Sequence, residues 1–242
     1  MFYTETFRPR YSELDRNGLM FYDALLGVLE NAAGHHSENS GDFVMENHAK
    51  GISWILVEWR VRLARRPHGG DCLNVRTWVR GKANSSVVYR DFIVSDADGA
   101  EIVRAEAKFV LMDMTALRLT RIGEERFLAY RPEEELVFES DAPRLRPLEE
   151  YETERILSLR KSDFDINCHV HNTKYMDFVA EAIPGSLPED GIAEFRLACL
   201  KPIVEQDGIV LNYAGRENAH FAAIRAGGNI CALCELIKRQ AD

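Results

Sequence analysis

The sequence predicts an α+β fold made of two similar units, each with one helix wrapped by an antiparallel sheet. Three observations predict it: a motif that occurs twice, a helix-forming segment after each copy, and strand-like segments after each helix. Residues 10–17 read Arg-Tyr-Ser-Glu-Leu-Asp-Arg-Asn, and residues 160–167 read Arg-Lys-Ser-Asp-Phe-Asp-Ile-Asn. Such repetition is typical of a duplicated structural unit.

In the first unit, a leading strand precedes a helix over 19–33, whose apolar residues recur at helical spacing. Gly34 is expected to end this helix. Alternating polar and apolar residues then predict strands over 55–63 and 72–79. Residues 89–95 and 101–112 form a predicted hairpin that turns at Asp98-Gly99.

The second unit repeats this order. A helix from about 172 to 183 is stopped by Pro184-Gly185, and strands follow over 192–200 and 209–214. A hairpin of 220–226 and 230–238 turns at residues 227–229. A lone helix with an apolar face must bury it against a twisted sheet, so each unit is a predicted hot-dog unit and the chain a tandem double hot-dog.

The predicted boundaries are 1–123 for the amino-terminal unit, 124–152 for a linker and 153–242 for the carboxy-terminal unit. The linker is rich in glutamate and contains Pro132, Pro143 and Pro147. This composition indicates a solvated connector with short helical pieces, which lets two similar units pack side by side.

Composition limits the class of protein. The net charge of −9 argues against nucleic acid as the main partner, and no apolar run is long enough to span a membrane. Residues 1–5 lack the start of a secretory signal, so a cytoplasmic protein is expected. The five scattered cysteines favour reduced thiols over a disulfide framework. Cys231 and Cys234 lie in a strand-like segment, where residues three apart point to opposite faces, so they are not expected to bind a metal.

The second motif copy carries the candidate catalytic residues. Asp165, Asn167 and His169 alternate, so an extended segment would point all three to one side. There the carboxylate can orient the imidazole, the amide can position substrate, and His169 can move a proton near neutral pH. The first copy has Leu19 in place of the histidine, so Asp165 and Asn167 are expected to have a partly structural role. A metal site made of Asp165, His169 and His171 lacks a further ligand, so no metal or cofactor is expected.

These residues carry a resemblance to a known family. The segment Asp165-x-Asn167-x-His169-Val170-x-Asn172-x-Lys174-Tyr175 resembles the central motif of the acyl-ACP thioesterases, double hot-dog enzymes of fatty acid biosynthesis. The likeness covers nearly the whole chain, and the first half contributes Trp54-Ile55-Leu56, Arg65-Arg66-Pro67, Gly70-Asp71, Thr77-Trp78 and Arg90. Without a segment like the plastid-targeting extension of plant members, the sequence is expected to be a bacterial form.

The resemblance implies a thioester hydrolase that acts on fatty acyl-acyl carrier protein and releases a free fatty acid. The family's catalytic residues fall on Asp165, Asn167 and His169, with His169 as general base. It also implies an acyl-chain pocket in the amino-terminal unit, with lining candidates Leu25, Leu29, Trp54, Leu56, Trp59 and Trp78. Basic residues gather between Glu58 and Lys82, and we expect them to help dock the acidic carrier protein.

One departure from the family concerns the later strand. Members commonly place a glutamate where this chain has Ala198, beside Cys199. Two mechanisms are therefore weighed: water activated by His169, or attack by Cys199 with His169 as its base. Water is favoured, because a cysteine in an apolar strand is more often inert. Glu194 lies on the same strand face as residue 198, about 6–7 Å away, which leaves its ability to substitute open.

Three other functions remain open at this stage. An acyl-CoA thioesterase is the nearest, since hot-dog enzymes use either carrier. A dehydratase or hydratase also exists on this fold, although no second acid or base is placed as such an enzyme needs. A catalytically weakened acyl-binding protein is the third, because of Ala198. The acyl length and the oligomeric state, a homodimer included, are left open.

Overall fold

The structure, a computed structural model, describes residues 1–184, 191–204 and 208–240. Its first half contains helices α1 (Tyr22–Asn39) and α2 (Val44–Ala49). The strands of this half are β1 (Tyr3–Phe7), β2 (Ile52–Leu63), β3 (Leu73–Gly81), β4 (Val87–Ser95), β5 (Glu101–Asp113) and β6 (Arg118–Leu119).

The second half repeats the pattern after a short helix, α3 (Glu124–Ala129). Its main helix is α4 (Lys174–Ala182). The strands are β7 (Thr153–Leu157), β8 (Ile192–Cys199), β9 (Ile209–Gly215), β10 (Ala219–Ala226) and β11 (Asn229–Lys238). The strands predicted from alternation are therefore confirmed.

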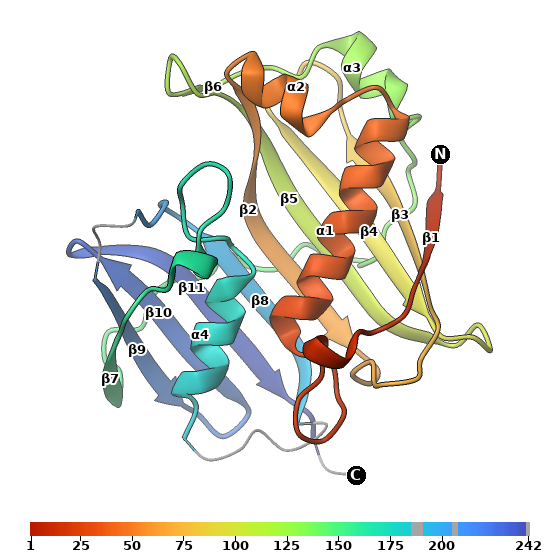
Figure 1. The fold of residues 1–242 in the computed structure, drawn as a ribbon. Helices are drawn as coiled ribbons and strands as arrows, with labels where there is room; N and C mark the ends of the chain where they lie inside the picture. The colour runs from red at the N-terminus through yellow and green to blue at the C-terminus, as the bar shows by residue number, and fades with distance from the viewer. Residues whose placement is uncertain (185–190, 205–207, 241–242) are drawn as a thin grey trace.

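The described strands form one antiparallel sheet in the order β1-β3-β4-β5-β2-β8-β11-β10-β9-β7, with β6 paired to β5. Helices α1 and α4 lie side by side on one face of this sheet (Figure 1). Lys174 Nζ donates to Asp23 Oδ2 at 2.6 Å and links the two helices. The predicted α+β tandem double hot-dog is confirmed.

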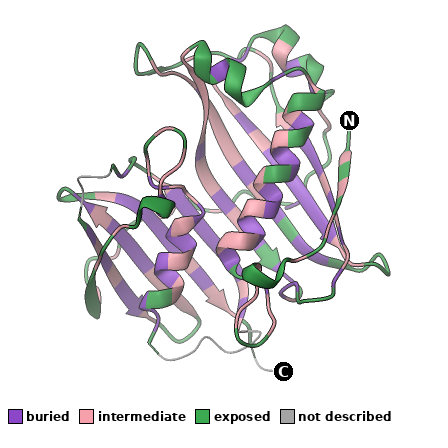
Figure 2. Cartoon of the chain, in the orientation of Figure 1, coloured by how far each residue is buried: buried purple, intermediate pink, exposed green. Residues whose placement is uncertain are grey.

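The two units are joined through β2 and β8, which pair antiparallel from Glu58 opposite Ala198 to Arg62 opposite Glu194. Alternate residues of both strands, such as Trp59 and Phe195, are fully buried and pack against α1 and α4. We call this the helix-side face of the sheet, and Figure 2 shows how the buried residues follow it. The residues between them point to the opposite, outer face.

Helix α1 is longer than predicted, because Gly34 does not end it. The helix continues to Asn39, where Ser40 Oγ donates to the carbonyl of His36 at 2.8 Å. Gly41 follows with φ of 77°, a left-handed conformation that glycine adopts without steric cost. The prediction placed the helix end at the wrong glycine.

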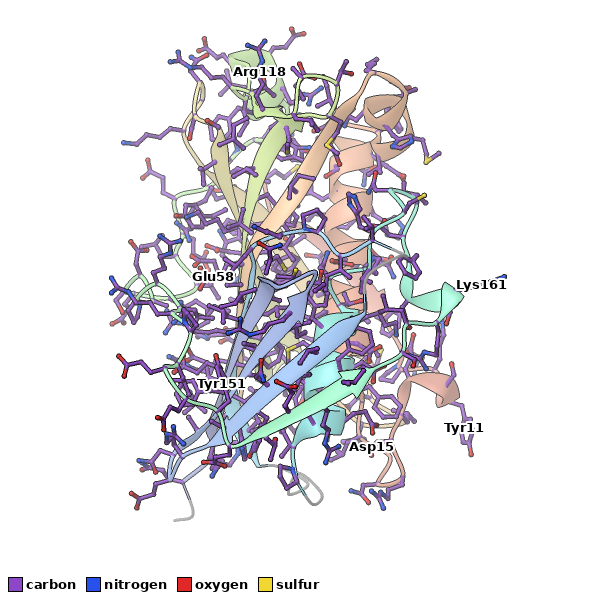
Figure 3. The ribbon with its side chains drawn as sticks, turned by 90° about the vertical axis from the view of Figure 1, so that its left-hand side faces the viewer. Tyr11, Asp15, Glu58, Arg118, Tyr151 and Lys161 are labelled. Carbon is purple, nitrogen blue, oxygen red and sulfur yellow. The ribbon has the colours of Figure 1, made fainter. Side chains whose placement is uncertain are left out.

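The connector is less solvated than its composition indicates. Phe127, Tyr130, Val137 and Phe138 are buried, and the last two pack against Trp78. Figure 3 shows Glu58 and Tyr151 on the side away from the helices, and Tyr11 and Lys161, from the two motif copies, on the helix side. The connector thus covers part of the outer face.

The prediction that Cys231 and Cys234 point to opposite faces is wrong. The register between β10 and β11 shifts by one residue beside Cys231, and this bulge resets the alternation. Both thiols belong to the core cluster under α4. Across the described ranges, no three His, Cys, Asp or Glu side chains are grouped as a metal site, and none of the helices is both long and apolar enough to cross a bilayer.

Candidate functional site

The second motif copy forms a tight turn, so the prediction of an extended segment is wrong. The backbone N–H of Cys168 donates to the carbonyl of Asp165 at 3.1 Å, and Cys168 has φ of 60°. Asp165 Oδ1 accepts the backbone N–H groups of Asn167 at 2.8 Å and His169 at 3.2 Å. The aspartate thus holds the turn that presents the other two candidate residues.

The first motif copy forms the same turn without the histidine. Asp15 Oδ1 accepts the N–H groups of Asn17 at 2.8 Å and Leu19 at 3.1 Å. Gly18, with φ of 76°, occupies the position that corresponds to Cys168. The aspartate therefore has the structural role expected from the sequence, whether or not a catalytic histidine follows.

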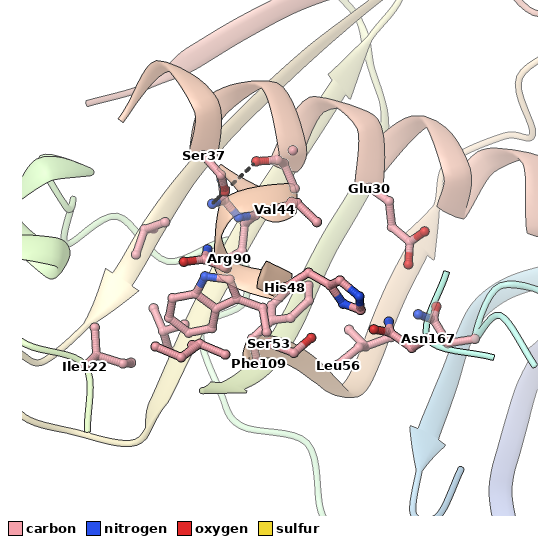
Figure 4. Close-up of a pocket in the computed structure, with 18 of the residues that line it drawn as sticks. Glu30, Ser37, Val44, His48, Ser53, Leu56, Arg90, Phe109, Ile122 and Asn167 are labelled. Carbon is pink, nitrogen blue, oxygen red and sulfur yellow. Dashed lines mark hydrogen bonds between the residues drawn. The ribbon is translucent and has the colours of Figure 1, made fainter. Parts of the chain in front are cut away.

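A cavity of about 280 Å³ runs along α1 and meets this turn. Most of its apolar lining comes from the first unit: Ala33, Val44, Ile52, Trp54, Leu56, Val79, Val88, Phe109, Ile122 and Phe127. Figure 4 shows Glu30 and Asn167 at one end of it and Ser37 and Arg90 at the other. The cavity is thus a mainly apolar channel, with polar groups at each end and His48 and Ser53 between them.

The second unit supplies part of one polar end. Ile166, Asn167, His171 and Asn172 line the cavity there, and Glu30 of α1 lies opposite them. Of the three predicted catalytic residues, Asn167 is among the described lining residues. Asp165 lies behind it, with Asn167 Nδ2 at 3.5 Å from Asp165 Oδ2. The half-buried side chain of His169 is outside the lining set.

Glu30 is the residue that sequence reasoning missed. Its Oε2 lies 3.5 Å from His171 Nε2, and the Asn172 carboxamide donates to its carboxylate. Burial raises the pKa of Glu30, although the His171 side chain opposes this effect. The sequence feature that could have identified Glu30 is its position in the apolar stripe of α1, where a carboxylate stands between the buried Leu26 and Ala33.

The tautomer of His171 follows from its neighbour. His171 Nδ1 accepts the backbone N–H of Thr173 at 3.4 Å and lies 2.9 Å from Thr173 Oγ1. A backbone N–H can only donate, so Nδ1 is the acceptor and the neutral ring carries its proton on Nε2. That proton faces Glu30.

Residue 198 is not at the cavity. Ala198 packs against Ala223 and Leu233, in a cluster separate from the helix-side core. Glu194, on the same outer face, binds Arg60 Nε at 2.8 Å and Arg62 Nε at 3.0 Å. The later strand therefore directs these side chains away from the cavity, and Glu194 is held in ion pairs.

The predicted lining is confirmed in part. Trp54 and Leu56 line the cavity. Leu25, Leu29 and Trp59 belong instead to the packed core under α1. Trp78 lies on the outer face, where its Nε1 donates to the carbonyl of Glu135 at 2.9 Å.

A buried polar network closes the far end of the cavity. Arg90 contacts His36 Nδ1 at 2.8 Å and donates to Ser37 Oγ at 3.3 Å, while Tyr130 donates to Asp42 at 2.7 Å. Burial, with the neighbouring Arg90 charge, lowers the pKa of His36 to about 3. His36 is therefore neutral near pH 7 and can accept the guanidinium N–H.

The basic segment expected to dock the carrier protein is largely neutralised inside the fold. Arg66 is buried and bound to Asp15 at 2.9 Å, and Arg65 is bound to Asp71 at 2.7 Å. Four more arginines also form ion pairs: Arg60 and Arg62 with Glu194, Arg76 with Glu135, and Arg80 with Asp91 and Glu106. The excess charge along the sequence does not become a surface of unpaired arginines.

Two family models match the chain. The acyl-ACP thioesterase N-terminal domain matches residues 1–130, and the acyl-ACP thioesterase C-terminal domain matches residues 146–219. An acyl-[acyl-carrier-protein] hydrolase of Cuphea viscosissima is 25% identical over 94% of this chain, and a palmitoyl-acyl carrier protein thioesterase of Gossypium hirsutum is 26% identical over 90%. Both are chloroplastic, and the chain spans 60% and 57% of their lengths.

Solved structures share the fold. A 12:0-ACP thioesterase from Umbellularia californica superposes with a TM-score of 0.87 at 22% identity, covering 98% of this chain and 97% of that one. An acyl-ACP thioesterase from Bacteroides thetaiotaomicron gives a TM-score of 0.87 at 21% identity, covering 98% of each chain. These likenesses extend over both units and their connector.

Proposed function

The chain belongs to the acyl-ACP thioesterase family, and we propose that it hydrolyses the thioester of fatty acyl-acyl carrier protein to a free fatty acid and holo-acyl carrier protein. One observation carries this proposal: an apolar channel in the first unit ends at polar groups of the second. An acyl chain fits the apolar part, which places its thioester beside the polar end. The names of the relatives support acyl carrier protein as the group that carries the acyl chain in the thioester substrate.

For the chemistry, we propose Asp165, Asn167 and His169 as catalytic residues. Asp165 holds the turn through two backbone N–H groups. The Asn167 carboxamide, which lines the cavity, donates to the thioester oxygen as negative charge develops on it. His169 acts as general base, as the family motif implies. A water molecule attacks the carbonyl carbon, and the bond to sulfur then breaks.

The test is thiol release and fatty acid formation from acyl carrier proteins that carry C8 to C18 chains. We expect turnover by the wild type, and a fall in kcat of about 10²-fold or more for Asn167→Ala and His169→Ala, the usual size for an oxyanion donor or a base. The matched control is Asn17→Ala, the same turn position in the first unit. Tight acyl binding without turnover on any carrier would contradict hydrolysis and favour an acyl-binding protein.

A further inference from the structure

We infer that Glu30, a residue outside the family motif, is a further catalytic residue of this site and is the group that accepts the proton of the attacking water, the step that the family motif by itself gives to His169. The inference rests on the proposed function, and it concerns a side chain of the first unit that completes a site of the second. Its basis is the geometry of α1: the Glu30 carboxylate lines the cavity, opposite Asn167 and beside His171 and Asn172.

The first argument is the supply of carboxylates. A water molecule that attacks a thioester needs a proton acceptor within hydrogen-bond reach. On β8, Glu194 and the position of Ala198 both face the outer side of the sheet. Asp165 already accepts two backbone N–H groups and lies behind Asn167. Among the described residues that line the cavity, Glu30 is the carboxylate.

The second argument is how Glu30 is held. The His171 Nε2–H faces Glu30 Oε2 at 3.5 Å, and the Asn172 amide donates to the same carboxylate. Asn172 Oδ1 is buried and accepts no hydrogen bond from the described protein groups. The contacts with His171 and Asn172 hold the carboxylate at the cavity, where a water can donate one proton to Glu30 and keep an oxygen lone pair for the carbonyl carbon. His171 and Asn172 are positioning residues in this arrangement.

The step balances without a further reactant. The water oxygen forms a bond to the carbonyl carbon while one water proton passes to Glu30, and Asn167 donates to the carbonyl oxygen. The tetrahedral intermediate collapses, the carbon–sulfur bond breaks, and Glu30 returns the proton to the leaving sulfur. The products are a carboxylic acid and a thiol, and the Glu30 carboxylate is regenerated.

The electrostatic surroundings suit this role. Burial raises the pKa of Glu30, which makes it a stronger base than an exposed glutamate. The ionisable groups around it come from several elements: Asp165 and His171 from the second motif segment, Cys199 from β8, and His48 from α2 across the cavity. Of these, His171 lowers and Asp165 raises the pKa of Glu30.

The experiment compares Glu30→Gln with the wild type on acyl carrier protein substrates. We expect kcat to fall about 10²- to 10⁴-fold, the range for loss of a general base, with KM changed little. The matched control is Glu38→Gln, an exposed carboxylate on the same helix, for which kcat is expected to be unchanged. A raised pKa means that the ionised form of Glu30 destabilises the folded state, and at pH 8 this form predominates. Glutamine removes that cost. The Tm of Glu30→Gln at pH 8 should therefore be no lower than that of the wild type.

A second readout separates a base from a merely structural side chain. In the wild type, the acid limb of kcat/KM should lie above the ordinary pH range of a glutamate. His171→Gln should move that limb to higher pH, because it removes the imidazole that lowers the pKa of Glu30. Wild-type kcat in Glu30→Gln, with hydrolysis intact, would overturn the role of Glu30 alone. Absence of hydrolysis in the wild type would overturn the proposed function itself.

Discussion

At the scale of single residues, the neighbours Ala198 and Cys199 of β8 lie on opposite faces of the sheet. Cys199 packs against the helix-side core, and burial raises the pKa of its thiol to about 12. At pH 8 only about one thiol in 10⁴ is then ionised, and the thiolate is the nucleophilic form. The geometry therefore favours water over Cys199 as the attacking group.

We predict that Cys199→Ala keeps the acyl carrier protein hydrolase activity. The expected kcat is within about threefold of wild type, since the change removes one small group from a packed face; a lost covalent nucleophile would cost far more. Steady-state thiol release measures this. The control is Cys72→Ala, a cysteine in the turn before β3. A loss above about 10²-fold, with an unchanged unfolding curve, would restore the cysteine mechanism.

The candidate site was predictable only in part at this scale. The repeat indicated that Asp165 has a partly structural role, and Asp165 and Asp15 do make the same two hydrogen bonds in their turns. It could not indicate which side chains line the cavity, since the assumed extended backbone is a turn with Cys168 at positive φ. Glu30 escaped notice because a helical stripe is recognised by its apolar members.

At the scale of the elements, the two motif turns are a natural comparison of glycine with another residue. Gly18 has φ of 76° and open space where a Cβ would stand, so a substitution there meets backbone strain alone. Cys168 has φ of 60° and an exposed side chain, so it bears that strain already. The left-handed conformation costs an ordinary residue about 1–2 kcal/mol.

We predict opposite effects on stability from exchanging these residues. Gly18→Ala should lower the free energy of unfolding by about 1 kcal/mol, because the strain exceeds the entropy that alanine removes from the unfolded chain. Cys168→Gly should raise the free energy of unfolding by less than about 1 kcal/mol. Glycine relieves the strain at positive φ, but its greater freedom in the unfolded chain offsets part of that gain. Urea unfolding curves measure both. A more stable Gly18→Ala variant would show that the turn is not held at positive φ.

At the scale of the whole molecule, the junction of β2 and β8 turns two units into one sheet. On its outer face, the nearly fully buried Arg196 binds Glu58 at 2.5 Å across the junction and Glu235 at 3.6 Å on β11. These carboxylates are partly exposed, so solvent screens the pairs to some degree. The arginine nonetheless joins three strands from both units.

We predict that Arg196→Met destabilises the whole chain by about 2–3 kcal/mol. The substitution leaves the carboxylates of Glu58 and Glu235 without their shared cation. The expected loss is smaller than for a fully buried ion pair, because both carboxylates are partly exposed. Arg216→Met, which breaks an exposed pair with Glu152, should cost less than about 1 kcal/mol. Chemical unfolding followed by tryptophan fluorescence compares them. Equal losses in the free energy of unfolding for the two variants would mean that the ion pairs of Arg196 contribute little to the stability of the junction.

The sequence by itself determined the two units, their helices and strands, and the family. Periods of two and 3.6 residues are properties of neighbouring residues, and a duplicated motif reports a duplicated unit without knowledge of contacts. For the arginines between Glu58 and Lys82, the sequence specifies the number of charges but not the residues that pair with them. Their charge was correctly counted, but Arg60 and Arg62 are paired with a carboxylate from the other unit.

Only the tertiary structure decided which groups meet at the cavity. Glu30 and His171 belong to different units, and they approach each other because α1 and α4 pack side by side on one sheet. The structure also decided that Ala198 faces away, because the register of β8 against β2 and β11 assigns each of its residues to one face. Long-range packing, which leaves no periodic trace in a single sequence, assembles a site from both halves of the duplication.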